Sequence, residues 1–136
     1  MSGDRLESTA TLHARLRWAG IGLFGLALIA FALNLAAAAA GHAPFARVLL
    51  SVFALGMSLG TFGANCDTAL HAMRQLHREG RLPARFAAEW AHERAVRPEK
   101  IEALHAAPRM ALALPVVAFL AVTWASWRGL VAWGLA

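Results

Sequence analysis

The stretch that decides the fold is V-L-L-S-V-F-A-L-G-M-S-L-G-T-F-G-A-N-C, residues 48–66, which carries no charged residue over 19 positions. Two further uncharged stretches flank it in the sequence, 29 positions between Arg17 and Arg47 and 18 positions between Arg109 and Arg128. The hydrocarbon core of a bilayer is about 30 Å thick, and roughly 20 apolar helical residues cross it. Because lipid offers the backbone no hydrogen-bond partner, each stretch is expected to be an α-helix.

These stretches predict an all-α integral membrane protein with one membrane domain over residues 1–136. Its three transmembrane helices are expected at about 18–40, 45–66 and 108–127, with a short helical cytoplasmic segment at about 67–107 between spans two and three. The composition agrees, because 59% of the 136 residues are apolar, against 45–50% in an ordinary soluble domain. The first span is longer than the 7–15 apolar residues of a signal peptide, so we expect it to be a retained anchor.

The segment between spans two and three is expected to hold two short helices. The helical pattern of span two continues to Gly80, a residue suited to the C′ position of a helix end. Pro83 and Pro98 are then both placed to open a helix, since proline is favoured in the first turn. On the first of these helices Phe86 and Trp90 lie four residues apart and share a face. We expect both aromatic rings to rest on the membrane or on a partner, with Glu89 and Glu93 facing water.

The distribution of basic residues predicts the orientation. Of the 13 lysine and arginine residues, eleven lie in residues 1–17 and 74–109, whereas Arg47 and Arg128 are the two on the other side. The positive-inside rule therefore places the N-terminus and the 67–107 segment in the cytoplasm and the C-terminus in the periplasm. The arginine- and alanine-rich composition indicates a GC-rich genome, which favours a bacterial source, so we expect the bacterial inner membrane. Trp124, Trp127 and Arg128 form an expected interfacial cluster at the end of span three.

Span two carries the best-defined packing pattern. Gly56, Gly60 and Gly63 follow one face, and small residues of this kind let two helices approach closely in lipid. A second face combines small and polar residues: Ser51, Ala54, Ser58, Thr61 and Asn65. The two faces predict helix contacts on both sides of the span. One interpretation is oligomerisation or docking into a larger complex, and the other is packing against spans one and three of the same chain.

No arrangement of catalytic or metal-binding residues is recognisable in the sequence. There is no G-x-S-x-G nucleophile motif, phosphate-binding loop or H-E-x-x-H zinc motif, and Cys66 is the single cysteine. Asp67, His71 and Arg74 share a helix face, which indicates an interfacial charged cluster or, alternatively, a proton-carrying pair of Asp67 and His71. His71 and His105 invite a haem hypothesis, but no histidine lies within the three expected spans. We therefore expect no cofactor, no metal and no enzyme activity.

The leading hypothesis is a non-catalytic accessory, assembly or scaffold component of an inner-membrane complex. Its expected partners are the lipid bilayer and other membrane subunits or further copies of the chain, whereas the basic charge is explained by topology rather than by nucleic acid. One alternative is a haem- or quinone-associated anchor subunit of a redox complex, which reduced-minus-oxidised spectral bands would reveal. Another is a small oligomeric transporter or channel protomer, for which Asn34 and Asn65 supply the strongest polar groups in the spans.

Overall fold

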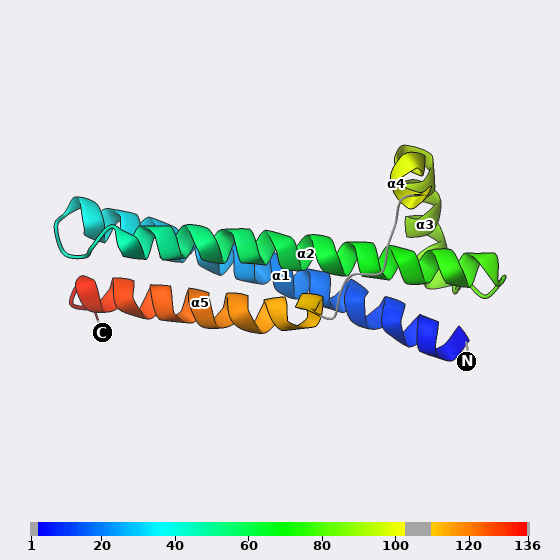
Figure 1. Cartoon of the computed structure of the whole chain (residues 1–136), viewed down its shortest axis with the longest axis horizontal. Coiled ribbons are helices and arrows are strands. Elements are labelled where there is room, and N and C mark those ends of the chain that lie inside the picture. The colour runs from blue at the N-terminus through cyan, green and yellow to red at the C-terminus, as the bar shows by residue number, and fades with distance from the viewer. Residues whose placement is uncertain (1–2, 103–109, 136) are drawn as a thin grey trace. The chain divides into compact units, whose positions relative to one another are not determined.

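The structure is a computed structural model that describes residues 3–102 and 110–135 (Figure 1). All regular structure in these residues is α-helical, in the order α1 (Gly3–Ala39), α2 (Ala46–Arg78), α3 (Ala84–Val96), α4 (Pro98–Glu102) and α5 (Met110–Ala132). Helices α1, α2 and α5 are long and apolar enough to cross a membrane. The predicted all-helical fold with three such helices is therefore confirmed, and the two short helices expected between spans two and three are α3 and α4.

The described residues divide into two compact units. Unit 1 contains residues 3–17 and 63–102, and unit 2 contains residues 18–62 and 110–135. Helices α1 and α2 are each divided between the two units, whereas α3 and α4 belong to unit 1 and α5 belongs to unit 2. Residues 3–17, expected to be a short lead-in, form the first turns of α1.

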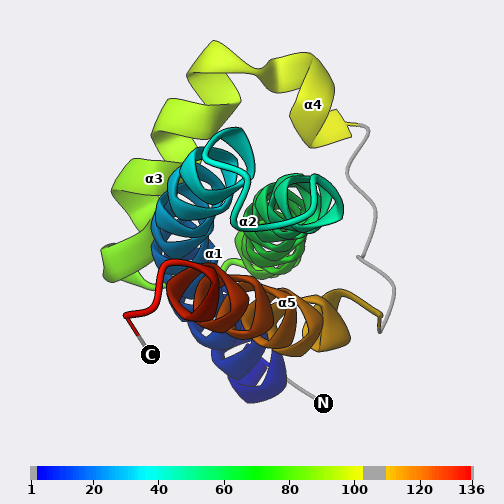
Figure 2. The ribbon, with the colours of Figure 1, turned by 90° about the vertical axis from the view of Figure 1, so that its left-hand side faces the viewer.

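Unit 2 is a bundle of three helix segments whose interior is built from small side chains. In Figure 2 these segments of α1, α2 and α5 are seen nearly end-on as three neighbours. Ala27 of α1, Ala54 of α2 and Val122 of α5 meet in its core, so each helix contributes one residue to the shared contact. Alanine at these positions lets the helix backbones lie close together.

Unit 1 has a core of larger side chains. Met73 and Leu76 of α2 are completely buried there, and Phe86 and Trp90 of α3 pack into the same cluster. Ala10 of α1 and Ile101 of α4 complete this cluster, so all four elements of the unit share one core. Burial of large apolar side chains is the ordinary way in which a water-exposed helical unit is stabilised.

The ends of the long helices follow the expected glycine chemistry. At the end of α2, Gly80 has a φ of 69°, a left-handed conformation that glycine adopts without the clash of a Cβ atom. The N–H of Arg81 donates to the carbonyl of Leu76 at 2.9 Å, and the N–H of Gly80 donates to that of His77 at 3.1 Å. This pair of bonds is the Schellman motif, so the predicted C′ position of Gly80 is confirmed.

Candidate functional site

The small polar face of α2 lies inside unit 2 from Ser51 to Thr61. Ser51, Ser58 and Thr61 are completely buried. Each hydroxyl donates to a carbonyl oxygen one turn earlier on the same helix, Ser51 to Arg47 at 3.0 Å, Ser58 to Ala54 at 2.8 Å and Thr61 to Met57 at 2.9 Å. Such bonds satisfy a hydroxyl within its own helix, so the face stays narrow and a neighbouring helix can approach it.

Asn34 is the polar centre of unit 2. Its side chain is completely buried, and its Nδ2 lies 2.7 Å from the carbonyl oxygen of Ala30, 3.2 Å from Oγ of Ser51 and 2.9 Å from the carbonyl oxygen of Ala125. One amide therefore joins α1 to both α2 and α5. Its Oδ1 is buried and has no hydrogen-bond partner among the described residues. The sequence shows Asn34 as a polar residue of span one, but its bonds to two other helices were not predicted.

The glycine face of α2 is open. A Cβ atom placed on Gly56 or Gly60 in unit 2, or on Gly63 in unit 1, would have nothing from the described residues within 4 Å beyond the adjoining turns of its own helix. Gly20 of α1 behaves in the opposite way, because its Cβ would lie 2.9 Å from the backbone nitrogen of Phe62. The close helix approach within unit 2 thus occurs at Gly20, and the expected glycine face of α2 is left uncovered in the described part of the chain.

Asn65, the last residue of the small polar face, lies in unit 1 and pairs with a buried histidine. Nδ1 of His13 and Oδ1 of Asn65 are 2.6 Å apart. Because an amide oxygen can only accept, this contact requires the proton of His13 to be on Nδ1. His13 is not among the predicted site residues. The sequence feature that points to such a residue is Asn65, since an amide side chain on a buried face needs a polar partner from another helix.

An ion pair joins α1 to α3 one helical turn after His13. Both terminal nitrogens of Arg17 bind the carboxylate of Glu89, one of them at 3.3 Å, and both side chains are partly buried. This two-point geometry matches the planar guanidinium to the carboxylate. Glu89 therefore faces a partner in the same chain rather than water. The side chain of Glu93 is also largely covered, with 15% exposed, and accepts from Arg97 at 3.0 Å.

Phe86 and Trp90, which were expected to rest on the membrane or on a partner, are buried within the chain itself. Their exposed fractions are 7% and 5%, and they belong to the core cluster of unit 1. Residues of α1 and α2 from the same chain cover them, so neither ring is presented to a membrane or partner surface. The reason is that α1 and α2 both extend beyond the apolar stretches, and these extensions supply the cover that the stripe on α3 needs.

The charged face at residues 67–74 forms links to α4. Oδ1 of Asp67 lies 3.2 Å from Nζ of Lys100. One terminal nitrogen of Arg74 donates to the carbonyl oxygen of Ile101 at 2.6 Å, and the other lies 3.1 Å from Nδ1 of His71. These contacts fit an ionic cluster that holds α4 on α2. His105, the second residue of the haem hypothesis, lies outside the described residues.

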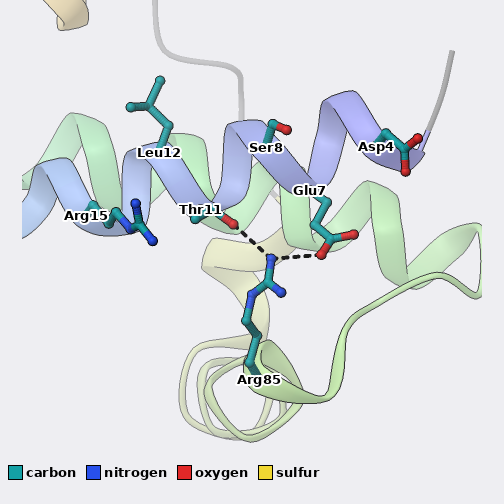
Figure 3. A pocket seen from close by; sticks show the side chains of 7 residues that line it. All are labelled: Asp4, Glu7, Ser8, Thr11, Leu12, Arg15 and Arg85. Atoms are coloured by element: carbon teal, nitrogen blue, oxygen red, sulfur yellow. Dashed lines mark hydrogen bonds and ion pairs between the residues drawn. The ribbon is translucent and has the colours of Figure 1, made fainter.

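A shallow surface pocket of about 500 Å³ lies between α1 and α3 in unit 1 (Figure 3). The guanidinium of Arg85 projects from α3 toward α1, where it donates to Oε1 of Glu7 at 2.8 Å and to Oγ1 of Thr11 at 3.0 Å. The remaining lining residues are Asp4, Ser8, Leu12 and Arg15. Because Arg85 and Glu7 pair with each other across it, the pocket has the character of an exposed helix–helix contact.

The interfacial cluster expected on α5 is exposed in unit 2. The indole rings of Trp124 and Trp127 are about half exposed, and Arg128 is partly buried. A terminal nitrogen of Arg47 donates to the backbone carbonyl of Arg128 at 3.1 Å, which joins the start of α2 to α5. The structure therefore brings the two periplasmic-side arginines of the sequence analysis together, a pairing that was not predicted. Their depth in a bilayer stays a prediction.

Within the described residues, no three histidine, cysteine, aspartate or glutamate side chains gather closely enough to hold a metal ion. Comparisons of the chain with protein-family models, with curated proteins and with solved structures found no match. The arrangement of the two faces of α2 is therefore the basis for the functional argument.

Proposed function

We propose that this protein is a non-catalytic accessory, assembly or scaffold component of a bacterial inner-membrane complex. The observation that carries the proposal is the contrast between the two faces of α2. Its small polar face is used up by contacts within the chain, whereas its glycine face at Gly56, Gly60 and Gly63 is uncovered in the described residues. A helix with one face committed and a second close-packing face available is suited to bind another membrane helix.

The surface of unit 2 supports a membrane location. Exposed large apolar side chains gather there, and Leu12 and Val96 are the two described examples in unit 1. Leaving apolar surface in water costs about 25 cal/mol per Å². A bilayer removes this cost, and the charged residues of unit 2, Arg47 and Arg128, both lie near helix ends. The same reasoning accounts for the small side chains inside the unit, because lipid supplies no hydrophobic force between helices.

The glycine face is tested by replacing Gly60 with leucine. The added side chain blocks close approach of a partner helix, whereas its Cβ atom meets nothing within 4 Å in the described residues beyond the adjoining turns of its own helix. We expect native-gel size or the set of co-purifying membrane proteins to change, while the helical content and thermal stability of the isolated chain do not. Gly22→Leu is the matched control, since Gly22 lies on α1 and is equally open. If the Gly60 variant assembles like the parent, the glycine face contacts lipid and the scaffold proposal loses its basis.

The proposed orientation is tested with reporters. A reporter fused after Ala136 is expected to behave as periplasmic, and one inserted near Gly80 as cytoplasmic, because eleven basic residues lie in residues 1–17 and 74–109 and two lie elsewhere. A fusion after Gly41, in the link between α1 and α2, serves as the second periplasmic point. Opposite behaviour at either fusion point would contradict the charge-based orientation. Fusion proteins that are found in the soluble fraction of the cytosol would contradict membrane insertion.

A further inference from the structure

A second feature of unit 2 concerns its surface rather than its helix contacts. An apolar groove of about 780 Å³ lies between α2 and α5. Its lining is almost entirely hydrocarbon: Leu50, Val117, Leu120, Ala121, Thr123, Trp124 and Trp127. A volume of this size is within the range of small-molecule sites, which are about 300–1,000 Å³. An apolar groove on a membrane-facing surface is filled by hydrocarbon chains rather than by water.

One end of the groove carries positive charge. Arg47 lies one turn before Leu50 on α2, and Arg128 lies next to Trp127 and one turn after Trp124 on α5, so both arginines neighbour lining residues. The bond from Arg47 to the carbonyl of Arg128 holds the two residues together. Nε of Arg128 is buried and has no hydrogen-bond partner among the described residues.

This charge is not balanced within the unit. Residues 18–62 and 110–135 contain no aspartate or glutamate, so no carboxylate of unit 2 is available to pair with the two guanidinium groups. A buried or partly buried cation without a counter-charge is costly, and an anion from outside the chain would relieve that cost. Arginine is the residue best suited to bind the oxygens of a phosphate group, because its planar fork presents two parallel donors.

We propose that the groove and the Arg47/Arg128 pair form a binding site for one anionic phospholipid. An acyl chain lies along the groove between α2 and α5, and the headgroup phosphate meets the two arginines. Trp124 and Trp127 contact the region between chain and headgroup, where amphipathic indole rings are favoured. We favour a phospholipid because its apolar chain and anionic headgroup match the apolar groove and the two arginines at one end of it. This inference rests on the membrane insertion proposed above.

Native mass spectrometry of the full chain, released from nanodiscs of equal parts phosphatidylglycerol and phosphatidylcholine, tests the site. We expect one retained lipid per chain, with phosphatidylglycerol favoured on the order of tenfold because each arginine near the surface adds attraction to anionic lipid. The double variant Arg47→Gln/Arg128→Gln should lose this preference. Arg81→Gln/Arg94→Gln removes two exposed arginines of unit 1 and should keep it. Equal retention of both lipids by the parent, or an unchanged preference in the Arg47/Arg128 variant, overturns the proposal.

The groove is tested separately. Thr123→Trp fills it with a large ring and should lower retention of both lipids at least several-fold, whereas Phe119→Trp, at an exposed α5 position outside the lining, should not. If inorganic phosphate alone binds to the parent chain at the two arginines, the site is a simple anion site and the lipid assignment is overturned.

Alkaline extraction of membranes from every variant distinguishes the lipid-site proposal from the proposal of membrane insertion. Chains that stay in the membrane but show no lipid preference contradict this site alone, and chains that are extracted contradict membrane insertion.

Discussion

The two units of the molecule bury opposite kinds of side chain. Unit 1 encloses large apolar residues, Met73, Leu76, Phe86 and Trp90, and its described ion pairs lie at or near its surface. Unit 2 encloses mainly alanine, serine, threonine and asparagine, with Leu23 as its one buried leucine among the described residues, and it exposes many of its large apolar side chains and all four of its described tryptophans. The same helices α1 and α2 contribute to both interiors, so the difference arises from the composition of each helix segment and not from the type of secondary structure.

This difference fits the proposed membrane location, in which water surrounds unit 1 and lipid surrounds unit 2. Large side chains placed inside are stabilised by their removal from water, which is the dominant force for a unit surrounded by water. In lipid that force is absent between helices, and stability comes from close packing of small residues and from interhelical hydrogen bonds. The three substitutions below test the comparison, beginning with the one that is expected to have the largest effect.

Trp90→Ala tests the water-type core of unit 1. Removing this buried ring should lower the free energy of unfolding by about 3–5 kcal/mol, the usual cost of truncating a large core side chain. Hydrogen exchange followed by mass spectrometry should speed up in peptides from α3 and from residues 63–78, with little change in α5. Trp90→Phe should be much milder, because Nε1 of Trp90 is buried without a partner in the described residues and phenylalanine has no N–H to satisfy. Fast exchange in α5 as well would contradict independent stabilisation of the two units.

Gly20→Ala tests the close packing of unit 2. Its Cβ would lie 2.9 Å from the backbone of Phe62, and backbone cannot move aside as a side-chain tip can. The clash should cost roughly 1–3 kcal/mol, partly offset by about 1 kcal/mol from the higher helix propensity of alanine. Thermal unfolding in detergent micelles measures it against Gly22→Ala, which meets open space. Equal melting temperatures for the two variants would show that α1 and α2 do not approach closely at Gly20.

Asn34→Ala tests the hydrogen bonds that join the three helices of unit 2. The loss should be about 0.6 kcal/mol and no more than about 1.7 kcal/mol, the average and the maximum measured for side-chain hydrogen bonds in a membrane protein. It is expected to be much smaller than that of Trp90→Ala because the substitution also removes Oδ1, which is buried without a partner in the described residues. Unfolding in mixed micelles provides the measurement, with the exposed Leu35→Ala as control. A loss as large as that of Trp90→Ala would mean that polar bonds, and not packing, dominate unit 2.

The parts of the fold that depend on residues close together in the sequence were predictable from sequence patterns. Uncharged length predicted three long helices, and Gly80 marked the end of α2 because its conformation depends only on its neighbours in the chain. The stripe of Phe86 and Trp90 also correctly indicated an apolar face on α3. The identity of its cover was not predictable, because periodicity shows that a face is apolar but not which segment packs on it.

The candidate site divides in the same way. The two faces of α2 are visible in the sequence at helical spacing, yet the spacing does not reveal which face is used within the chain. That information depends on partners distant in sequence, such as Asn34 for Ser51, 17 residues away, and His13 for Asn65, 52 residues away. The pairing of Arg47 with Arg128 across 81 positions is of the same kind. Such contacts need the tertiary arrangement before they can be stated.

The crowding at Gly20 also has a consequence for natural variation. Every missense codon change at this position adds at least a Cβ atom, so purifying selection should remove substitutions there even in lineages that exchange much of the surrounding helix. Gly22 and Gly25 on the same helix meet open space and carry no such restriction within the chain. A saturation library of α1, scored for protein abundance in cells, should therefore be depleted of variants at Gly20 and tolerant at the other two glycines.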